Sequence, residues 1–195
     1  MSIKAVLFDL DCRLLKMDQD EFVKTYFKYL AIHLAPRGYE DKEYIDEFYK
    51  NGFNKVEAVC GKYKEANEII ALVKKKGKTP ILATNPLFPH TATENRMRWA
   101  GLNVADFAEY TTYENCHFCK PNPKYYEELL ERHNLKPEEC IMVGNDVEED
   151  MIPTEKLGMR GFLLTNCLIN KRNQDTSKYP QGDFEALKVY LEELL

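Results

Sequence analysis

The sequence predicts an α/β fold, in which a parallel β-sheet carries helices on both faces and a small helical insertion follows the first strand. After residue 78, short apolar runs typical of buried strands alternate with helical patterns. This alternation favours a parallel sheet, because each connecting helix covers one face of it. Residues 14–78 break the alternation, since their apolar and aromatic residues recur at helical spacing. We therefore assign residues 1–13 and 79–195 to the core and residues 14–78 to the insertion.

The predicted strands are short apolar runs, and several predicted helices are bounded by residues that begin or end helices. Gly101 and Gly158 follow two helical patterns, at the position where glycine commonly ends a helix. Pro121 and Pro123 stand near the start of another, where a missing amide hydrogen is tolerated. The predicted strands span residues 5–8, 79–84, 107–113, 140–143 and 161–164. The predicted helices span residues 22–34, 44–59, 65–76, 91–100, 123–133, 148–157 and 183–195.

The composition disfavours nucleic acid and membranes as partners. The formal net charge is −5 and no basic stripe stands out, which argues against nucleic acid binding. No apolar run reaches the roughly 18 residues that a membrane-spanning helix needs. Asp9 and Asp11 interrupt any signal-peptide core near the N-terminus, so we expect a cytoplasmic protein. In that compartment the six cysteines would be reduced thiols.

Cys116 and Cys119 have the spacing of half a zinc site. A structural zinc site needs a second pair of ligands, and the sequence shows no matching pair, with His133 as the nearby additional candidate. Ordinary loop thiols are therefore favoured over a zinc site.

Residue types that carry chemistry gather where predicted strands end. Asp9 and Asp11 follow the first strand, and Thr84 stands at the end of the second. Open parallel sheets bind ligands at the carboxyl ends of their strands. Asp9 and Asp11 would point to the same side, because side chains of extended chain alternate with period two. Two carboxylates at such a short distance repel each other. We therefore expect either a cation between Asp9 and Asp11 or different chemical roles for the two.

Four separated motifs stand out, which are Asp9-Leu10-Asp11, Thr84-Asn85, Lys120 before Pro121, and the run from Gly144 to Asp150. In these four places the sequence resembles the haloacid dehalogenase (HAD) superfamily, in its phosphatase-like branch with a short helical cap. Each motif is weak alone, but all four occur in the family's order and in the expected structural setting. The resemblance implies a Rossmann-like core with an α-helical cap inserted after the first strand, and it covers nearly the whole chain.

The resemblance also implies the hydrolysis of a small phosphorylated metabolite. Asp9 would attack phosphorus to form an aspartyl-phosphate, and Asp11 would protonate the leaving oxygen and then activate water. Thr84 would donate its hydroxyl to a phosphoryl oxygen, with help from the backbone amide of Asn85. Lys120 would neutralise charge on the phosphoryl group and on Asp9. Dehalogenating members lack the second acid, so Asp11 favours phosphoryl transfer.

A Mg²⁺ site is a further implication, formed by Asp9, the backbone carbonyl of Asp11 and Asp146. Mg²⁺ takes oxygen ligands and commonly binds through one or two carboxylates plus substrate oxygens. The family commonly has an acid directly after the glycine of the fourth motif, where this chain has Asn145. Asp146 is the favoured ligand, directly or through water, with Asn145 or Asp150 nearby.

Two departures from the family pattern keep alternative functions open. Cys12 and Arg13 stand where the family usually has Gly-Thr or Gly-Val. Glycine permits a tight turn there, and Arg13 would place a cation beside Asp11 that weakens it as an acid. The insertion is also short for a four-helix cap, so it would close poorly over a substrate. The alternatives to an active phosphatase are a catalytically impaired binding or regulatory protein and, less favoured, a sugar phosphomutase. The sequence assigns no oligomeric state, and no role to the polar loop of residues 166–180.

Overall fold

Five parallel strands form the central sheet, in the order β4–β1–β5–β6–β7. In the computed structural model, which describes residues 2–12, 14–36 and 42–195, all neighbouring strands of this sheet pair in parallel. The predicted α/β class with a parallel sheet is therefore confirmed. The strands are β1 (Ala5–Phe8), β4 (Thr79–Leu82), β5 (Cys140–Gly144), β6 (Arg160–Leu164) and β7 (Gln181–Gly182).

Helices cover both faces of the sheet, because its inner strands are apolar on both sides. Val6 and Phe8 of β1 pack into the cluster that includes α3 and α7, whereas Ala5 and Leu7 pack into the cluster that includes α5. Burial on both faces explains why β1 is continuously apolar. Within the described ranges, no helix is long and apolar enough to cross a membrane. The bounds are α3 (Lys64–Lys75), α5 (Pro123–Arg132), α6 (Ile152–Lys156), α7 (Phe184–Leu194) and the short turns η3 (Val104–Asp106) and η4 (Pro137–Glu139).

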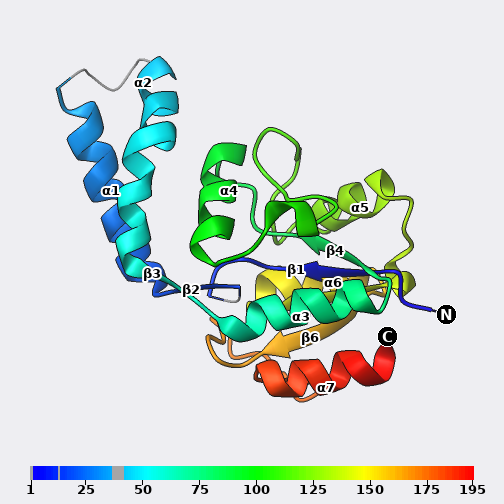
Figure 1. Cartoon of the computed structure of the whole chain (residues 1–195). Coiled ribbons are helices and arrows are strands. Elements are labelled where there is room, and N and C mark those ends of the chain that lie inside the picture. Colours follow the sequence, from blue (N-terminus) through cyan, green and yellow to red (C-terminus); the bar gives the residue numbers. More distant parts are fainter. Residues whose placement is uncertain (1, 13, 37–41) are drawn as a thin grey trace.

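The cap helices, α1, α2, η1 and η2, project from the sheet beside α4 (Figure 1). An antiparallel ribbon of β2 and β3 joins them to the core. The ring of Phe53 in the cap lies 6.4 Å from that of Phe22 and 5.0 Å from that of Trp99 in α4, so cap and core share one apolar cluster. The bounds are β2 (Leu15–Met17), α1 (Gln19–Leu34), α2 (Lys42–Glu47), the π-helical η1 (Phe48–Gly52), η2 (Phe53–Val59), β3 (Cys60–Lys62) and α4 (His90–Trp99).

Helix α3 connects the cap to the sheet and packs with the sheet. It contacts α7 and β4, although it falls within the range of residues 14–78 assigned above to the insertion. These contacts favour counting α3 with the core. The division of the chain into cap and core at residues 13 and 78 stays a proposal.

Residues 107–113 form a strand only in part, which corrects a sequence expectation. The amide of Thr111 donates to the carbonyl of Leu82 in β4 at 3.0 Å, and Tyr110 forms an isolated parallel bridge with the same residue. The amide of Thr112 then donates to the side chain of Asn115 at 2.8 Å. The ladder with β4 does not continue past this bridge, and the chain turns at residues 113–115.

Candidate active site

The carboxyl ends of β1, β4 and β5 lead to a cavity of about 150 Å³. The polar residues at these ends come from distant parts of the sequence. The parallel sheet brings them together because the strands that precede them end at one edge. The predicted residues that line the cavity are Asp9, Asp11, Asn85, Asn145, Asp146 and Asp150.

Lys120 is buried next to the cavity and pairs with two carboxylates. Its Nζ lies 3.2 Å from Asp9 Oδ1 and 2.6 Å from Asp150 Oδ1. Burial alone would lower the pKa of Lys120, but the charges of Asp150 and Asp9 outweigh burial and raise this pKa well above its usual value. Lys120 is therefore a cation at neutral pH and touches the carboxylate of Asp9.

Asp150 anchors the fourth motif to the protein. Its Oδ1 accepts a hydrogen bond from Lys120, and its Oδ2 accepts from the backbone amides of Asn145 at 3.1 Å and Asp146 at 3.2 Å. Both oxygens of Asp150 are thus engaged within the protein. Which of Asn145, Asp146 and Asp150 contacts a metal ion stays a prediction.

Gly144 allows Asp150 to pack against the end of β5. A Cβ atom at residue 144 would lie 2.2 Å from Asp150 Oδ2 and 2.4 Å from its Cγ. Because Lys120 and two amides hold Asp150 in place, we expect Gly144→Ala to destabilise the protein by about 1–3 kcal/mol, the usual cost of overpacking. Urea unfolding followed by circular dichroism measures the loss. Gly61→Ala is the matched control, since its nearest neighbour would lie 3.5 Å away; equal losses in both variants would contradict this explanation.

The cavity is crowded with carboxylates around η5 (Val147–Met151). Asp146 caps this turn, and its Oδ1 accepts from the amides of Glu148 and Glu149, both at 2.9 Å. Burial raises the pKa of Asp146, with the neighbouring carboxylate of Asp150 adding to the effect. Burial also raises the pKa of Glu149, to which Asp146, Asp150 and Asp9 contribute. A bound cation would relieve this concentration of negative charge.

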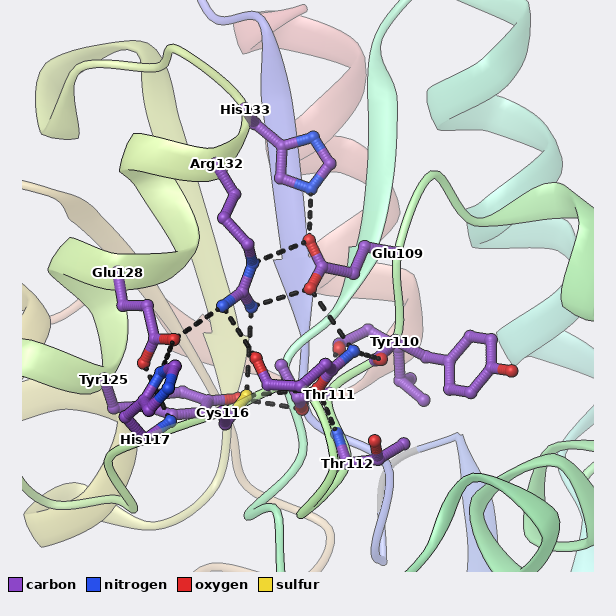
Figure 2. Close-up of polar contacts among 12 residues, drawn as sticks. Glu109, Tyr110, Thr111, Thr112, Cys116, His117, Tyr125, Glu128, Arg132 and His133 are labelled. Carbon is purple, nitrogen blue, oxygen red and sulfur yellow. Dashed lines mark hydrogen bonds and ion pairs between the residues drawn. The ribbon is translucent and has the colours of Figure 1, made fainter.

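The carbonyl of Thr84 is bound from two sides. Thr111 Oγ1 donates to it at 2.6 Å and the Tyr125 hydroxyl at 2.9 Å, two side chains that Figure 2 shows next to each other. Burial raises the pKa of Tyr125, so its hydroxyl stays protonated and able to donate. Thr84 is itself buried, and among the described residues it is not part of the cavity lining. Its contact with a phosphoryl group stays a prediction.

Arg132 of α5 holds the irregular segment that leads to the third motif. In Figure 2 it lies between two carboxylates: its Nη2 is 2.6 Å from Glu109 Oε1 and its Nη1 is 2.9 Å from Glu128 Oε1. Its Nη1 also donates to the carbonyl of Asn115 at 2.9 Å. These contacts tie both ends of residues 109–115 to α5.

The two cysteines of the possible zinc motif are free and differ in their surroundings. Cys116 Sγ lies 3.8 Å from Arg132 Nη2, whereas Cys119 is exposed. His133 contacts Glu109 through Nε2 at 2.7 Å. Cys116 and His133 are thus part of the network around Arg132. In the part of the chain that the structure describes, no three His, Cys, Asp or Glu side chains are grouped to hold a metal by themselves.

Asp11 pairs with a cation that the four motifs do not reveal. Arg96 of α4 is 1% exposed and forms an ion pair with Asp11 through Nη2 and Oδ2. Arg13, the residue expected to place a cation there, lies outside the described residues. The available signal was helical spacing: Arg96 shares a helix face with Ala92 and Trp99, both of which are buried.

Cys12 adopts a backbone conformation that favours glycine. Its φ is 58°, in the left-handed region that costs other residues roughly 1–2 kcal/mol. Its thiol lies 3.2 Å from the carbonyl of Met17, to which it donates a weak hydrogen bond. The turn after Asp11 therefore forms without glycine, at an energetic cost.

Two further residues at the cavity have no role assigned to them from the sequence. Glu149 Oε2 accepts from Asn85 Nδ2 at 3.2 Å, which links the second and fourth motifs. Lys171 also lines the cavity, and it belongs to the polar loop after β6. The amide of Ile169 in this loop donates to the carbonyl of Asn145 at 2.9 Å. Only the tertiary structure shows that the loop lies against the fourth motif.

Comparison with known proteins places this chain in a family. A family model for haloacid dehalogenase-like hydrolases matches residues 14–158. The chain is 35% identical over 72 residues to the glyceraldehyde 3-phosphate phosphatase of Methanothermobacter thermautotrophicus, which covers 37% of this chain and 32% of that protein. It is 26% identical over 188 residues to the pyrophosphatase PpaX of Bacillus cereus, which covers 82% of each chain.

Solved structures show the same fold. The HAD phosphatase of Thermococcus onnurineus superposes with a TM-score of 0.66 at 17% identity and covers 97% of this chain and 98% of its own. A Thermotoga maritima protein assigned as a β-phosphoglucomutase superposes with a TM-score of 0.72 at 17% identity, over 99% of this chain and 100% of its own. At such low identity the likeness concerns the fold, and the family model carries the assignment. The chain therefore belongs to the haloacid dehalogenase-like hydrolases, the enzyme family that its four motifs resemble.

Proposed function

We propose that the protein is a Mg²⁺-dependent phosphatase that hydrolyses a small phosphomonoester through an aspartyl-phosphate. The observation that carries the proposal is the contact between Lys120 and Asp9 at the cavity. A buried cation beside a carboxylate can offset the charge of an arriving phosphoryl group, and such electrostatic positioning carries most phosphoryl-transfer catalysis. The phosphatase and the pyrophosphatase among the relatives support this chemistry.

The proposed reaction has two steps, with Asp9 as nucleophile. A carboxylate oxygen of Asp9 bonds to phosphorus, the ester P–O bond breaks, and the leaving oxygen keeps the electron pair and takes a proton from Asp11. Water then attacks phosphorus, Asp11 takes a proton from it, and the bond to Asp9 breaks to release phosphate. Lys120 and the Thr84 hydroxyl would stabilise the phosphoryl oxygens. The cavity of about 150 Å³ favours a small substrate.

The residues around the cavity suit a hard cation such as Mg²⁺. Asp9 and Asp146 offer carboxylate oxygens, Asp11 offers its backbone carbonyl, and Asn145 offers a side-chain oxygen. Mg²⁺ usually keeps several waters and needs only one or two carboxylates, which agrees with the lack of a complete side-chain cage among the described residues. When bound, the ion would neutralise charge on the phosphoryl group.

Substitutions in the fourth motif test which residue binds the metal. Asp146→Asn removes a negative charge from the cavity, so we expect it to weaken Mg²⁺ binding about tenfold or more. Asn145→Asp adds a carboxylate and should tighten binding if the Asn145 oxygen is also a ligand. Isothermal titration with MgCl₂ measures both, independently of activity. Asp175→Asn, in an exposed part of the polar loop, is the control; unchanged affinity in both motif variants would refute the metal assignment.

A direct assay tests the phosphatase itself. Purified protein should release phosphate from para-nitrophenyl phosphate and from members of a panel of metabolite phosphates when Mg²⁺ is present. EDTA should abolish the release, and added Mg²⁺ should restore it. Lack of hydrolysis across the panel at saturating Mg²⁺ would overturn the proposed function.

Cys12 favours a second candidate, a catalytically impaired protein of the same fold. Its left-handed backbone is an unusual place for a side chain directly after Asp11. If the natural pair impairs the enzyme, Cys12→Gly with Arg13→Thr should raise kcat/KM for para-nitrophenyl phosphate by several orders of magnitude. We expect a change of less than about tenfold, because Asp11 already lines the cavity in the natural chain. A large gain would show that the natural protein is impaired.

A further inference from the structure

Arg96 is a buried arginine that faces the candidate active site from α4. Its side chain is 1% exposed, whereas that of Asp11, its ion-pair partner, is 35% exposed. Arg98, two residues later on the same helix, is exposed and contacts Asn95. The two arginines therefore differ in environment although they share one helix.

The surroundings of the Arg96 guanidinium are aromatic. Its Cζ lies 4.9 Å from the ring centre of Phe88 and 6.0 Å from that of Phe22 in the cap. None of its Nε, Nη1 and Nη2 atoms has a hydrogen-bond partner among the residues that the structure describes, so its contact with Asp11 is an ion pair alone. Removing a charge from water in this way costs several kcal/mol, and a buried ion pair often fails to repay that cost. Stability alone is thus a poor reason for an arginine at this place.

Asp11 uses one oxygen for Arg96 and leaves the other without a partner. Oδ2 forms the ion pair, and Oδ1 is buried without a hydrogen-bond partner in the described part of the chain. Asp11 also lines the cavity together with Asp9. A protonated carboxyl can accept a hydrogen bond at one oxygen and donate from the other, so Oδ1 calls for a ligand oxygen that accepts its hydrogen while Oδ2 faces Arg96.

We propose that Arg96 is a positioning residue, which holds Oδ2 of Asp11 so that Oδ1 meets the leaving oxygen of the substrate. This inference rests on the proposed phosphatase function. In the first step the ester P–O bond breaks, its electron pair stays on the leaving oxygen, and the proton from Asp11 completes the alcohol. Placement of Asp11 matters most when the leaving oxygen would otherwise depart as an unstable alkoxide. Arg96 therefore adapts the site to alkyl phosphates, such as phosphates of small alcohols or sugars.

Two substrates with different leaving groups separate this role from a structural one. The leaving group of glycerol 2-phosphate is an alcohol, which needs a proton from Asp11. The leaving group of para-nitrophenyl phosphate is a stable phenolate, which does not need this proton. We expect Arg96→Met to lower kcat/KM for glycerol 2-phosphate about 100-fold, the effect of a misplaced catalytic group, and to lower that for para-nitrophenyl phosphate less than about fivefold. Arg96→Lys, which keeps the charge, should restore part of the lost activity. Arg98→Met is the control on the same helix and should leave both activities unchanged.

The outcomes are distinct. Equal losses on both substrates, or a gain on glycerol 2-phosphate, would overturn the role of Arg96. Failure of the natural protein to hydrolyse either substrate would instead overturn the proposed function. If Arg96→Met does not fold, Arg96→Lys is compared in the natural and the Asp11→Asn backgrounds. An effect that disappears when Asp11 is replaced supports positioning through Asp11, and an equal effect in both backgrounds refutes it.

Discussion

Replacement of Asp9 by asparagine should abolish the hydrolysis of para-nitrophenyl phosphate, with a fall in kcat of about 10⁴-fold or more, the range seen when a nucleophile is removed. Asparagine has nearly the same shape as aspartate, but its neutral amide is a poor nucleophile toward phosphorus. Lys120 keeps its closer contact, at 2.6 Å to Asp150, so the site should keep its architecture. The measurement is steady-state release of para-nitrophenol at saturating Mg²⁺.

Two checks make the result for Asp9→Asn specific. Circular dichroism and thermal unfolding should show that the variant remains folded. Asp106→Asn removes a carboxylate that pairs with Lys74 on the surface, and we expect its activity to equal that of the natural protein. Activity of the Asp9 variant within tenfold of the natural enzyme would exclude Asp9 as the nucleophile.

Lys120→Met should destabilise the protein by about 3–5 kcal/mol, the usual effect of removing one partner of a buried ion pair. Asp150 is 1% exposed and would keep its charge without the cation that offsets it. Asp9 would lose the same cation, so activity should also fall. Urea unfolding followed by circular dichroism measures the stability at neutral pH.

Lys178→Met is a matched control for Lys120→Met. Lys178 pairs with Glu155 at 2.6 Å, the same distance as Lys120 to Asp150, but both Lys178 and Glu155 are about half exposed. Exposed ion pairs contribute little, because water and salt screen them, so the unfolding midpoint should barely move. Adding Asp150→Asn to Lys120→Met removes the stranded charge and should recover part of the lost stability. Equal losses of stability in the two lysine variants would show that burial does not determine how much the ion pair of Lys120 stabilises the protein.

The elements that local patterns specify were predictable from the sequence. The helix expected over residues 91–100 is α4 (His90–Trp99), and that expected over 123–133 is α5 (Pro123–Arg132). Periodicity and end signals define such helices, and both are local. The expected strand over 107–113 was only partly correct, because aromatic and β-branched residues favour a strand but do not say how far a neighbouring strand continues to pair.

The candidate site was predictable as a set of motifs but not as a set of contacts. Asp9, Asp11, Asn85 and Asp146 stand around one cavity, as the ends of parallel strands imply. Spacing along the chain could not distinguish Asp146 from Asp150. The structure adds that Lys120 donates a hydrogen bond to Asp150, whereas the choice of metal ligand stays a prediction.

The sequence by itself determined the α/β class, the family and the four motifs, because these depend on periodicity and on residue types at strand ends. Only the tertiary structure decided that Arg96 pairs with Asp11, that Asp150 is an anchor, and that the polar loop reaches the cavity through Lys171. The physical reason is that helices packed over the sheet bring distant residues into contact, and burial then sets how strongly their charges interact. Neither the contacts between distant residues nor the strength of their charge interactions can be derived from a local pattern of residues.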